Sequence, residues 1–347
     1  MTSQYAVIEF DQVDSFCAYS LPGSLEHSLV YSHRKTSITG NGTGPGIVFN
    51  SFDPVEEDVE FIEPDHVVKN GVFKFEPSGI CPLTSTSFED YEDKVNRALG
   101  EIEKGILEKV VLSRMLVTEN STDDLYDYFI NLKSLYPTAF VFLYHTPNRG
   151  CWCGATPEVI IRKEGDSFMT MALAGTQRNQ GLPLDLVEWT EKEYLEQGLI
   201  EVFVEDKLSG EKINFEKTSV ETFEAGQVLH LCSKYYVQDN IDAGLLVDCL
   251  HPGPAICGFP QKESMRFIRT FEGYPRMDYC GYIGLRNLSG HTDYYVNLRS
   301  MRIYQDKNVL FVGGGITFQS NAKDEWEETT MKSHTLLSSI SNPVVKE

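Results

Sequence analysis

The stretch GGGITFQSNAKDEWEETTMK, residues 313–332, combines the features around which the rest of the chain is arranged. Three glycines follow the apolar run VLFV, and a polar turn then leads into an apparent helix that opens with acidic residues. Glu325 and Glu328 are three residues apart, and Lys332 follows four residues after Glu328. On a helix, these intervals place the three side chains on one face.

A second pair of acidic residues has the same spacing. The segment EWTEKEYLEQG predicts a helix that carries Glu193 and Glu196 on one face. Two such helices that face each other would offer oxygen ligands to a hard divalent cation, and Mg2+ suits a site with only one or two carboxylates. The alternative is two solvated helix faces with internal ion pairs, and the two acid pairs alone do not decide between these interpretations.

Composition limits the classes of partner and compartment. The chain has 347 residues, enough for one large domain or two ordinary ones, and a net charge of −21. This charge argues against nucleic acid or an anionic membrane as partner, and an anionic substrate would need local cationic groups. The eight scattered cysteines are typical of reduced thiols, and neither a signal peptide nor a membrane span is predicted, so we expect a cytoplasmic protein.

Hydrophobic periodicity predicts an α+β fold with large, mainly antiparallel sheets and helices packed on the outside. Helices are expected at 88–108, 186–208 and 262–273, in addition to the acidic helix near the C-terminus. The run YYVNLRSMRIY is expected to form a hairpin with VLFVGGG. Residues 1–87 are weakly patterned and are expected to be the N-terminal part of the same fold, before a catalytic domain at 88–341 and a tail at 342–347.

Eight short motifs stand in a fixed order between residues 88 and 341. They are EKVVLSR (108–114), GATPE (154–158), ALAGT (172–176), KEYLE (192–196) with HL (230–231), LHPGPAICGFP (250–260), YCGYIG (279–284), NLRSMRI (297–303) and GGGI…EWEETTMK (313–332). Their joint order resembles the chorismate-utilising enzymes, which include isochorismate synthase, salicylate synthase, anthranilate synthase component I and aminodeoxychorismate synthase component I. The resemblance implies a Mg2+-dependent substitution on chorismate, in which a nucleophile adds at C2 and the C4 hydroxyl leaves.

The resemblance also assigns roles to the acidic residues of the two helices. Glu196 and Glu328 match the metal ligands of the family. Glu193 and Glu325 match carboxylates that lie near the metal or contact it through a water molecule. Mg2+ is therefore the expected cofactor, in a position to neutralise the ring carboxylate of the substrate.

Lys109 and Glu158 match the catalytic base and acid of the family. The isochorismate- and salicylate-forming members carry Lys at the first position, whereas the ammonia-using members typically carry Gln. A lysine can act as a general base on water if burial or a nearby cation lowers its pKa from about 10.4. A carboxyl at the edge of an apolar pocket can stay protonated and supply the proton that the departing C4 hydroxyl needs.

The remaining matches concern substrate binding. Arg299 and Lys332 match contacts to the pyruvyl carboxylate, for which Arg offers a planar fork and Lys a point charge. Backbone N–H groups are expected to approach the substrate at Gly175, Thr176, Gly313 and Gly315. His230 and Tyr279 match polar positions that line the substrate site, although both could equally be core residues with satisfied hydrogen bonds. Gln197 and Gly253 depart from the family, which often has His and Thr or Ser at these positions, and they put fine substrate contacts in doubt.

Together these residues favour an isochorismate synthase that feeds menaquinone or siderophore synthesis. The alternatives are a salicylate synthase, which goes on to eliminate pyruvate, an aminating enzyme such as anthranilate synthase component I, and an inactive chorismate- or cation-binding protein. Ala255 favours the synthase over the salicylate synthase, and Lys109 disfavours amination. We expect a monomer that takes the small molecule chorismate and has no nucleic-acid, membrane or amidotransferase partner.

Overall fold

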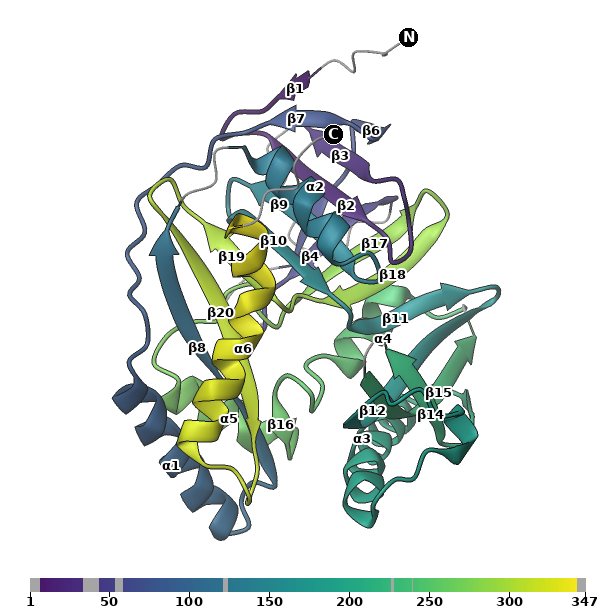
Figure 1. The fold of residues 1–347 in the computed structure, drawn as a ribbon. Coiled ribbons are helices and arrows are strands. Elements are labelled where there is room, and N and C mark those ends of the chain that lie inside the picture. The colour runs from purple at the N-terminus through teal and green to yellow at the C-terminus, as the bar shows by residue number, and fades with distance from the viewer. Residues whose placement is uncertain are drawn as a thin grey trace.

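The computed structural model of the protein describes residues 7–33, 44–53, 59–120, 124–225, 228–238 and 240–341. Two large, mainly antiparallel sheets carry the helices, which confirms the predicted α+β class (Figure 1). The predicted tail at 342–347 lies outside the described residues.

The first sheet follows the strand order β16-β8-β20-β19-β10-β9-β2-β3-β6. These strands are β16 (Gly258–Phe259), β8 (Lys109–Glu119), β20 (Lys307–Ile316), β19 (Ser300–Ile303), β10 (Gly150–Thr156), β9 (Phe140–Thr146), β2 (Ser15–Ser20), β3 (Ser28–Ser32) and β6 (His66–Lys69). The ladder between β8 and β20 continues without interruption over most of both strands. Strands β2, β3 and β6 come from the first 87 residues and complete the far side of this sheet.

The second sheet follows the order β13-β15-β12-β11-β18-β17-β4-β5, with β14 paired to β15. These strands are β13 (Phe215–Lys217), β15 (Val228–Gln238), β12 (Ser167–Arg178), β11 (Val159–Glu164), β18 (His291–Val296), β17 (Tyr282–Leu288), β4 (Gly46–Asn50), β5 (Glu60–Ile62) and β14 (Glu221–Ala225). A separate parallel pair joins β1 (Val7–Glu9) to β7 (Val72–Lys74).

One antiparallel ribbon passes from the first sheet to the second and connects them. Strand β10 pairs with β19 in the first sheet, and β11 pairs with β18 in the second. At the bend, the Val296 N–H donates to the Glu158 carbonyl at 3.0 Å, and the Ala155 N–H donates to the Arg299 carbonyl at 3.2 Å. Arg299 has a φ of 48°, in the left-handed region that non-glycine residues seldom enter.

This bend corrects one prediction. The run YYVNLRSMRIY is not a single strand of a hairpin, because the chain changes sheet at residues 297–299 and divides the run between β18 and β19. Only β19 pairs with β20, as the predicted hairpin requires. Strands that bend from one sheet into another are a common way to close two packed sheets.

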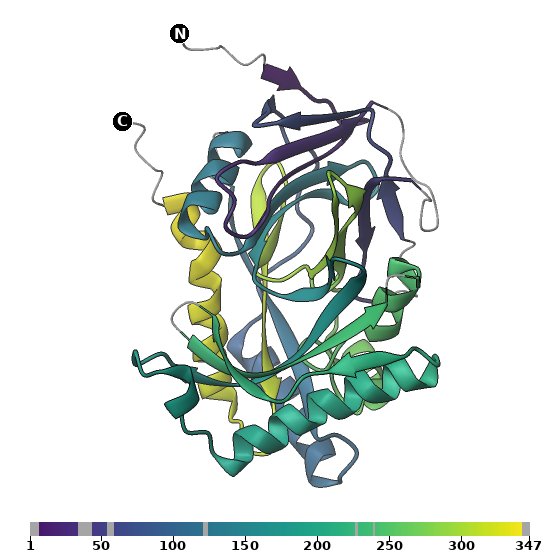
Figure 2. The same cartoon turned by 90° about the vertical axis from the view of Figure 1, so that its right-hand side faces the viewer.

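The helices pack on the faces and ends of the sheets. They are α1 (Phe88–Glu103), α2 (Leu125–Leu135), α3 (Glu191–Gly210), α4 (Ala243–Leu250), α5 (Gln261–Phe271) and α6 (Ala322–Ser341), with a short 3-10 turn η1 (Leu184–Leu186). Helix α6 lies along β20, and α3 lies across β12 and β15 (Figures 1 and 2). The two helices that were predicted to carry acid pairs therefore belong to opposite sheets.

Two predicted helix boundaries are wrong for local reasons. Helix α1 ends at Glu103, because Gly105 adopts a φ of 70° that stops the helix before the predicted end. Helix α3 begins at Glu191, several residues later than predicted. A capping box forms there, in which the side chains of Thr190 and Glu193 each bond the backbone of the other residue.

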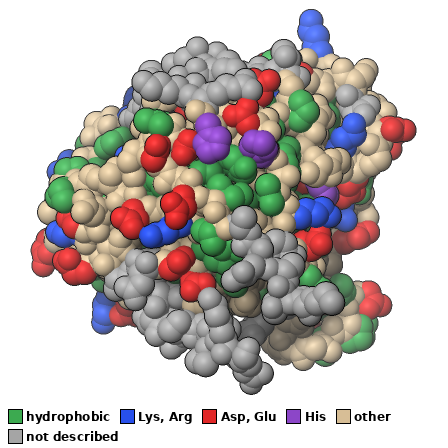
Figure 3. Space-filling model, turned by 90° about the horizontal axis from the view of Figure 1, so that it is seen from above, with side chains coloured by type: hydrophobic (Ala, Val, Ile, Leu, Met, Phe, Trp, Pro, Cys, Tyr) green, Lys and Arg blue, Asp and Glu red, His purple; other side chains and the backbone are tan. Residues whose placement is uncertain are grey.

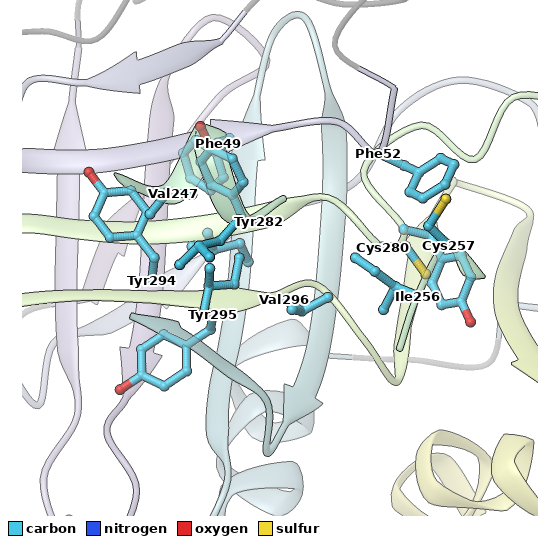
Figure 4. Close-up of a cluster of buried hydrophobic side chains, with 14 of the residues drawn as sticks. Phe49, Phe52, Val247, Ile256, Cys257, Cys280, Tyr282, Tyr294, Tyr295 and Val296 are labelled. Carbon is cyan, nitrogen blue, oxygen red and sulfur yellow. The ribbon is translucent and has the colours of Figure 1, made fainter. Parts of the chain in front are cut away.

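Aromatic side chains fill the space between the sheets. Tyr295 of β18 stacks on Phe140 of β9, with ring centroids 4.1 Å apart. Figure 4 shows the neighbouring part of this core, where Tyr282 and Tyr294 meet edge to face at 5.7 Å. Because these rings belong to strands of both sheets, their packing holds the connecting ribbon between two rigid layers.

The surface shows no single-sign patch on the face that Figure 3 presents. Acidic and basic side chains are interspersed there, at the end of the molecule where β1 and β7 lie. None of the helices within the described ranges is long and apolar enough to cross a membrane.

Candidate active site

The three glycines of β20 make room for three side chains that the sequence analysis assigns to the site. A Cβ added at Gly315 would lie 2.7 Å from Cε of Lys109, and one added at Gly313 would lie 3.0 Å from the Tyr279 hydroxyl. On the opposite face of the strand, a Cβ at Gly314 would lie 2.7 Å from a carboxylate oxygen of Glu325. The glycines therefore let Lys109 and Tyr279 approach one face of β20 while Glu325 approaches the other.

Lys109 opens β8 and lies between two neighbouring strands. Its backbone pairs with Phe259 of β16, and its carbonyl accepts a hydrogen bond from the Ser264 hydroxyl at 3.1 Å. The ammonium nitrogen lies 3.5 Å from Oε1 of Glu196, and only 22% of the side chain is exposed. The nearest charged partner is thus a carboxylate, and the side chain is mostly buried, which is one of the two conditions that the sequence analysis gave for a base at this position.

Glu158 lies at the bend of the ribbon, where β10 ends and β11 begins. Its side chain is half-buried, and its N–H donates to the Thr156 hydroxyl at 3.2 Å. Burial raises the pKa of the Glu158 carboxyl, while the positive charges of Lys109 and Arg299 oppose that rise. The predicted acid, base and one predicted substrate-binding cation therefore share one electrostatic environment.

Helix α3 brings only one of its two predicted ligands toward Lys109. Glu196 is the residue that contacts the lysine. One carboxylate oxygen of Glu193 accepts hydrogen bonds from the N–H and the hydroxyl of Thr190, at 2.7 and 3.0 Å. Glu193 thus belongs to the capping box at the N-terminus of the helix, a role that the E-x-x-E spacing did not reveal.

Helix α6 separates its two acids in a similar way. The Lys332 ammonium lies 2.6 Å from Oε1 of Glu328 and donates to the Gly313 carbonyl at 3.0 Å. Glu325 instead accepts a hydrogen bond from the Ser320 hydroxyl at 2.7 Å. Its second oxygen is buried without a hydrogen-bond partner, and burial and the charge of Glu328 raise its pKa.

The four acids do not form one cluster. Among the described residues, no group of three or more His, Cys, Asp or Glu side chains is arranged to hold a metal ion. The two acid-bearing elements nevertheless approach each other, because Lys192 of α3 donates a hydrogen bond to Gln319, just before α6, at 2.8 Å. Glu196 and Glu328, each paired with one lysine, remain the predicted metal ligands.

The predicted substrate-lining residues lie on both sheets. His230 of β15 contacts the Gly175 carbonyl through Nδ1 at 2.8 Å. Gly175 has a φ of 62° at a bulge in the β12–β15 ladder. Thr176 belongs to the same bulge, and its side chain lies outside the described part of the chain. Arg299 is exposed at the bend of the ribbon.

Tyr279 is buried beside the glycine strand. Its ring stacks on Phe311 of β20 with centroids 5.4 Å apart. Burial raises the pKa of the phenol well above its ordinary value, so the hydroxyl stays neutral near Gly313. The structure thus gives Tyr279 both a packing role and a polar group beside the glycines.

The two departures from the family pattern have different structural settings. Gln197 is buried between α3 and the second sheet, where its amide donates to the Ala172 carbonyl at 3.0 Å. A Cβ at Gly253 would meet only ordinary contacts, the nearest at 3.7 Å, so packing does not require glycine there. Gln197 consequently acts in helix packing, and a small side chain at 253 would fit.

Comparison with known proteins connects this site to a family. The sequence pattern of a family described as "Chorismate binding enzyme" matches residues 64–341. Isochorismate synthase EntC of Escherichia coli K12 is 28% identical over 261 residues, which span 71% of this chain and 66% of EntC. Isochorismate synthase MenF of Bacillus subtilis is 26% identical over 293 residues, spanning 81% and 60%. Anthranilate synthase component 1 of Saccharolobus solfataricus is 26% identical over 270 residues, spanning 74% and 63%.

Solved structures share the fold over nearly the whole chain. The menaquinone-specific isochorismate synthase MenF of E. coli superposes with a TM-score of 0.77 at 19% identity, over 95% of this chain and 89% of MenF. DhbC of Bacillus anthracis, described as a 2,3-dihydroxybenzoate-specific isochorismate synthase, gives 0.73 at 20% identity, over 96% and 97%. The curated relatives above are longer, and this chain spans slightly less than two thirds of their length.

Proposed function

We propose that this chain, which belongs to the chorismate binding enzyme family, is an isochorismate synthase that converts chorismate to isochorismate. The observation that carries the proposal is that the positive charges of Lys109 and Arg299 both act on the half-buried carboxyl of Glu158, at the junction of the two sheets. Relatives named isochorismate synthase support the same reaction.

The reaction needs one base and one acid on the substrate ring. Lys109 takes a proton from a water molecule while the water oxygen bonds to C2 of chorismate. The ring double bonds shift, the C4–O bond breaks, and Glu158 gives its proton to the leaving oxygen. One water is consumed and one is released, so the reaction is an isomerisation. The raised pKa of Glu158 supports this role, because burial keeps more of the carboxyl protonated.

The substrate carries two carboxylates, and the protein has a net charge of −21, so local cations must offset the repulsion. We assign Arg299 and Lys332 to the pyruvyl carboxylate. Arg299 is exposed at the bend, and Lys332 is held near the glycine strand by the Gly313 carbonyl. Substrate binding would replace the contact between Lys332 and Glu328 with a contact to the carboxylate of chorismate.

The donor set fits a Mg2+ ion. Glu196 and Glu328 offer carboxylate oxygens, and both are partly exposed and balanced only by lysine in the contacts described above. Mg2+ commonly binds through one or two carboxylates and keeps several waters, so it does not need a cluster of three acids. When bound, Mg2+ would neutralise the ring carboxylate of the substrate. We propose Glu196 and Glu328 as its direct ligands.

Product analysis tests this function against its alternatives. The protein is incubated with chorismate and Mg2+, with and without ammonium, and the products are separated by chromatography. We expect isochorismate without salicylate or an aminated ring. Salicylate with pyruvate would make the protein a salicylate synthase, and an amino product would make it an aminase. Chorismate binding without turnover would leave a binding protein. Isochorismate would be compatible with menaquinone or siderophore synthesis, because relatives named for both are known.

A further inference from the structure

We infer that Glu272 and Arg276 form a buried positioning pair that completes the open edge of β8 and thereby fixes Lys109 in the site. This inference rests on the base role proposed for Lys109. Neither residue was singled out from the sequence, although the segment FEGYPR places the two four residues apart. Both side chains are only 1% exposed, so water does not solvate either charge.

Strand β8 has one complete neighbour and one incomplete neighbour. Its ladder with β20 covers nearly the whole strand. On the other edge, β16 pairs with Lys109 and Val110, and the segment before it adds one bond, from the Val111 N–H to the Cys257 carbonyl at 2.9 Å. The backbone groups that follow on this edge need other partners, because a buried N–H or carbonyl without a hydrogen bond is costly.

The ion pair supplies these partners. The Arg276 guanidinium donates to the Val111 carbonyl at 2.7 Å. The Glu272 carboxylate accepts from the Ser113 N–H at 2.7 Å and from the Ser113 hydroxyl at 2.8 Å. One donor and one acceptor thus meet β8 where the next strand of an antiparallel sheet would otherwise provide them.

Arg276 also connects β8 to the loop that leads into β16. It donates to the Ile256 carbonyl at 2.9 Å, while its Nε lies 2.6 Å from Glu272. The guanidinium carbon lies 4.2 Å from the centre of the Phe52 ring. Arg276 therefore ties β8 to the loop that leads into β16, the strand whose Phe259 pairs with Lys109.

The pair reaches a second residue of the site through the backbone. The N–H of Tyr279 donates to the carbonyl of Arg276 at 3.0 Å. Because the hydroxyl of Tyr279 and the side chain of Lys109 both face the glycine strand, one buried pair sets the position of two neighbouring groups. A small displacement of a positioned base is enough to slow a reaction strongly.

The test is Arg276→Lys, which keeps the positive charge but cannot bridge Glu272, Val111 and Ile256 at once. We expect kcat to fall roughly 10- to 100-fold with little change in the calorimetric Kd for chorismate. Hydrogen exchange at the Ser113 amide should accelerate. The matched control is Arg269→Lys on α5, because Arg269 is a partly exposed arginine that pairs bidentately with Asp53. Its kcat should remain that of the wild type.

A milder variant covers the case in which Arg276→Lys does not fold. Ser113→Ala removes only the hydroxyl contact to Glu272, and we expect kcat to fall about twofold to tenfold with chorismate binding retained. If Arg276→Lys folds, a wild-type kcat in this variant would overturn the inference. If it does not fold, a wild-type kcat in Ser113→Ala would do so. If the wild type makes no isochorismate, the proposed function fails. The exchange rate of the Ser113 amide in the same variants then still decides whether the pair holds the strand.

Discussion

The two halves of the site are held in place by different means. Lys109, Glu158 and Arg299 lie on a strand and a ribbon whose backbone hydrogen bonds fix them between the sheets. Glu196 and Glu328 lie on helices, and each contacts one lysine side chain. Their side chains remain 42% and 49% exposed, whereas the positioning pair beside β8 is almost completely buried.

In the proposed mechanism, the strand and ribbon residues must stay in place, whereas Glu196 and Glu328 must exchange a lysine for Mg2+. Ion pairs with exposed members contribute only ~0–1 kcal/mol, so a cation can displace the lysines from Glu196 and Glu328 at little cost. The strand and ribbon residues have no such freedom, because moving them would break backbone pairing. We therefore expect variants of the helix half to change metal binding and variants of the other half to change the chemical step.

The largest expected effect is loss of the metal. Glu328→Gln or Glu196→Gln should abolish turnover and Mg2+ binding measured by calorimetry, because each removes a proposed charged ligand. EDTA should silence the wild type in the same way. Glu327→Gln is the matched control, since Glu327 is an exposed acid on the same helix. Full activity in EDTA would contradict the metal assignment.

The next effect concerns the acid and the base. Lys109→Gln and Glu158→Gln should each lower isochorismate formation at least ~100-fold, the usual contribution of a positioned acid or base. Mg2+ and chorismate binding should persist in both. Ammonia is already a nucleophile, so high ammonium should allow trace amination by Lys109→Gln but none by Glu158→Gln. Near-normal isochorismate production by Lys109→Gln would remove the water-activating role.

A smaller effect is expected at the exposed end of the ribbon. Arg299→Ala removes one charge-assisted contact worth ~1.5–3 kcal/mol, so the KM for chorismate should rise about 10- to 150-fold. Steady-state kinetics measure this change, and circular dichroism checks that the fold is intact. Arg302→Ala is the control, because Arg302 of β19 lies over the Tyr304 ring. An unchanged KM would give Arg299 a structural role.

The smallest effect appears in stability without ligands. Burial raises the pKa of Glu158, so its contribution to folding is present below the ordinary carboxyl pKa and is lost as the pH rises through the raised value. Glu158→Gln cannot ionise, and its stability relative to the wild type should therefore increase over that pH range. Urea denaturation at several pH values measures the difference. A constant difference would show that Glu158 ionises as readily as in the unfolded chain.

Local patterns were enough to predict the fold class and the helices that carry the acids. They also placed Lys109 at the start of a strand and Glu158 beside another. Patterns could not predict the change of sheet before β19, because the strand-forming run YYVNLRSMRIY continues through the bend without a break in composition. The same holds for Glu325, whose spacing matches that of Glu328 although its carboxylate accepts a hydrogen bond from Ser320 and lies against Gly314 of β20.

The positioning pair was missed for a related reason. Glu272 and Arg276 have the spacing of any exposed ion pair on a helix, and nothing nearby in the sequence indicates burial. Their partner Ser113 is far away in the chain, so only the tertiary structure brings the three together. A buried ion pair of this kind depends on which strand edge remains open, and a single sequence does not contain that information.

The ribbon between the sheets also has a consequence for how the chain folds. Its two halves are roughly 140 residues apart in the sequence, and contacts of such long range form slowly because a large loop must close first. Glu158 and Arg299 can face each other only after that closure. Recovery of chorismate binding during refolding would therefore follow a late, long-range step, after most local structure has formed.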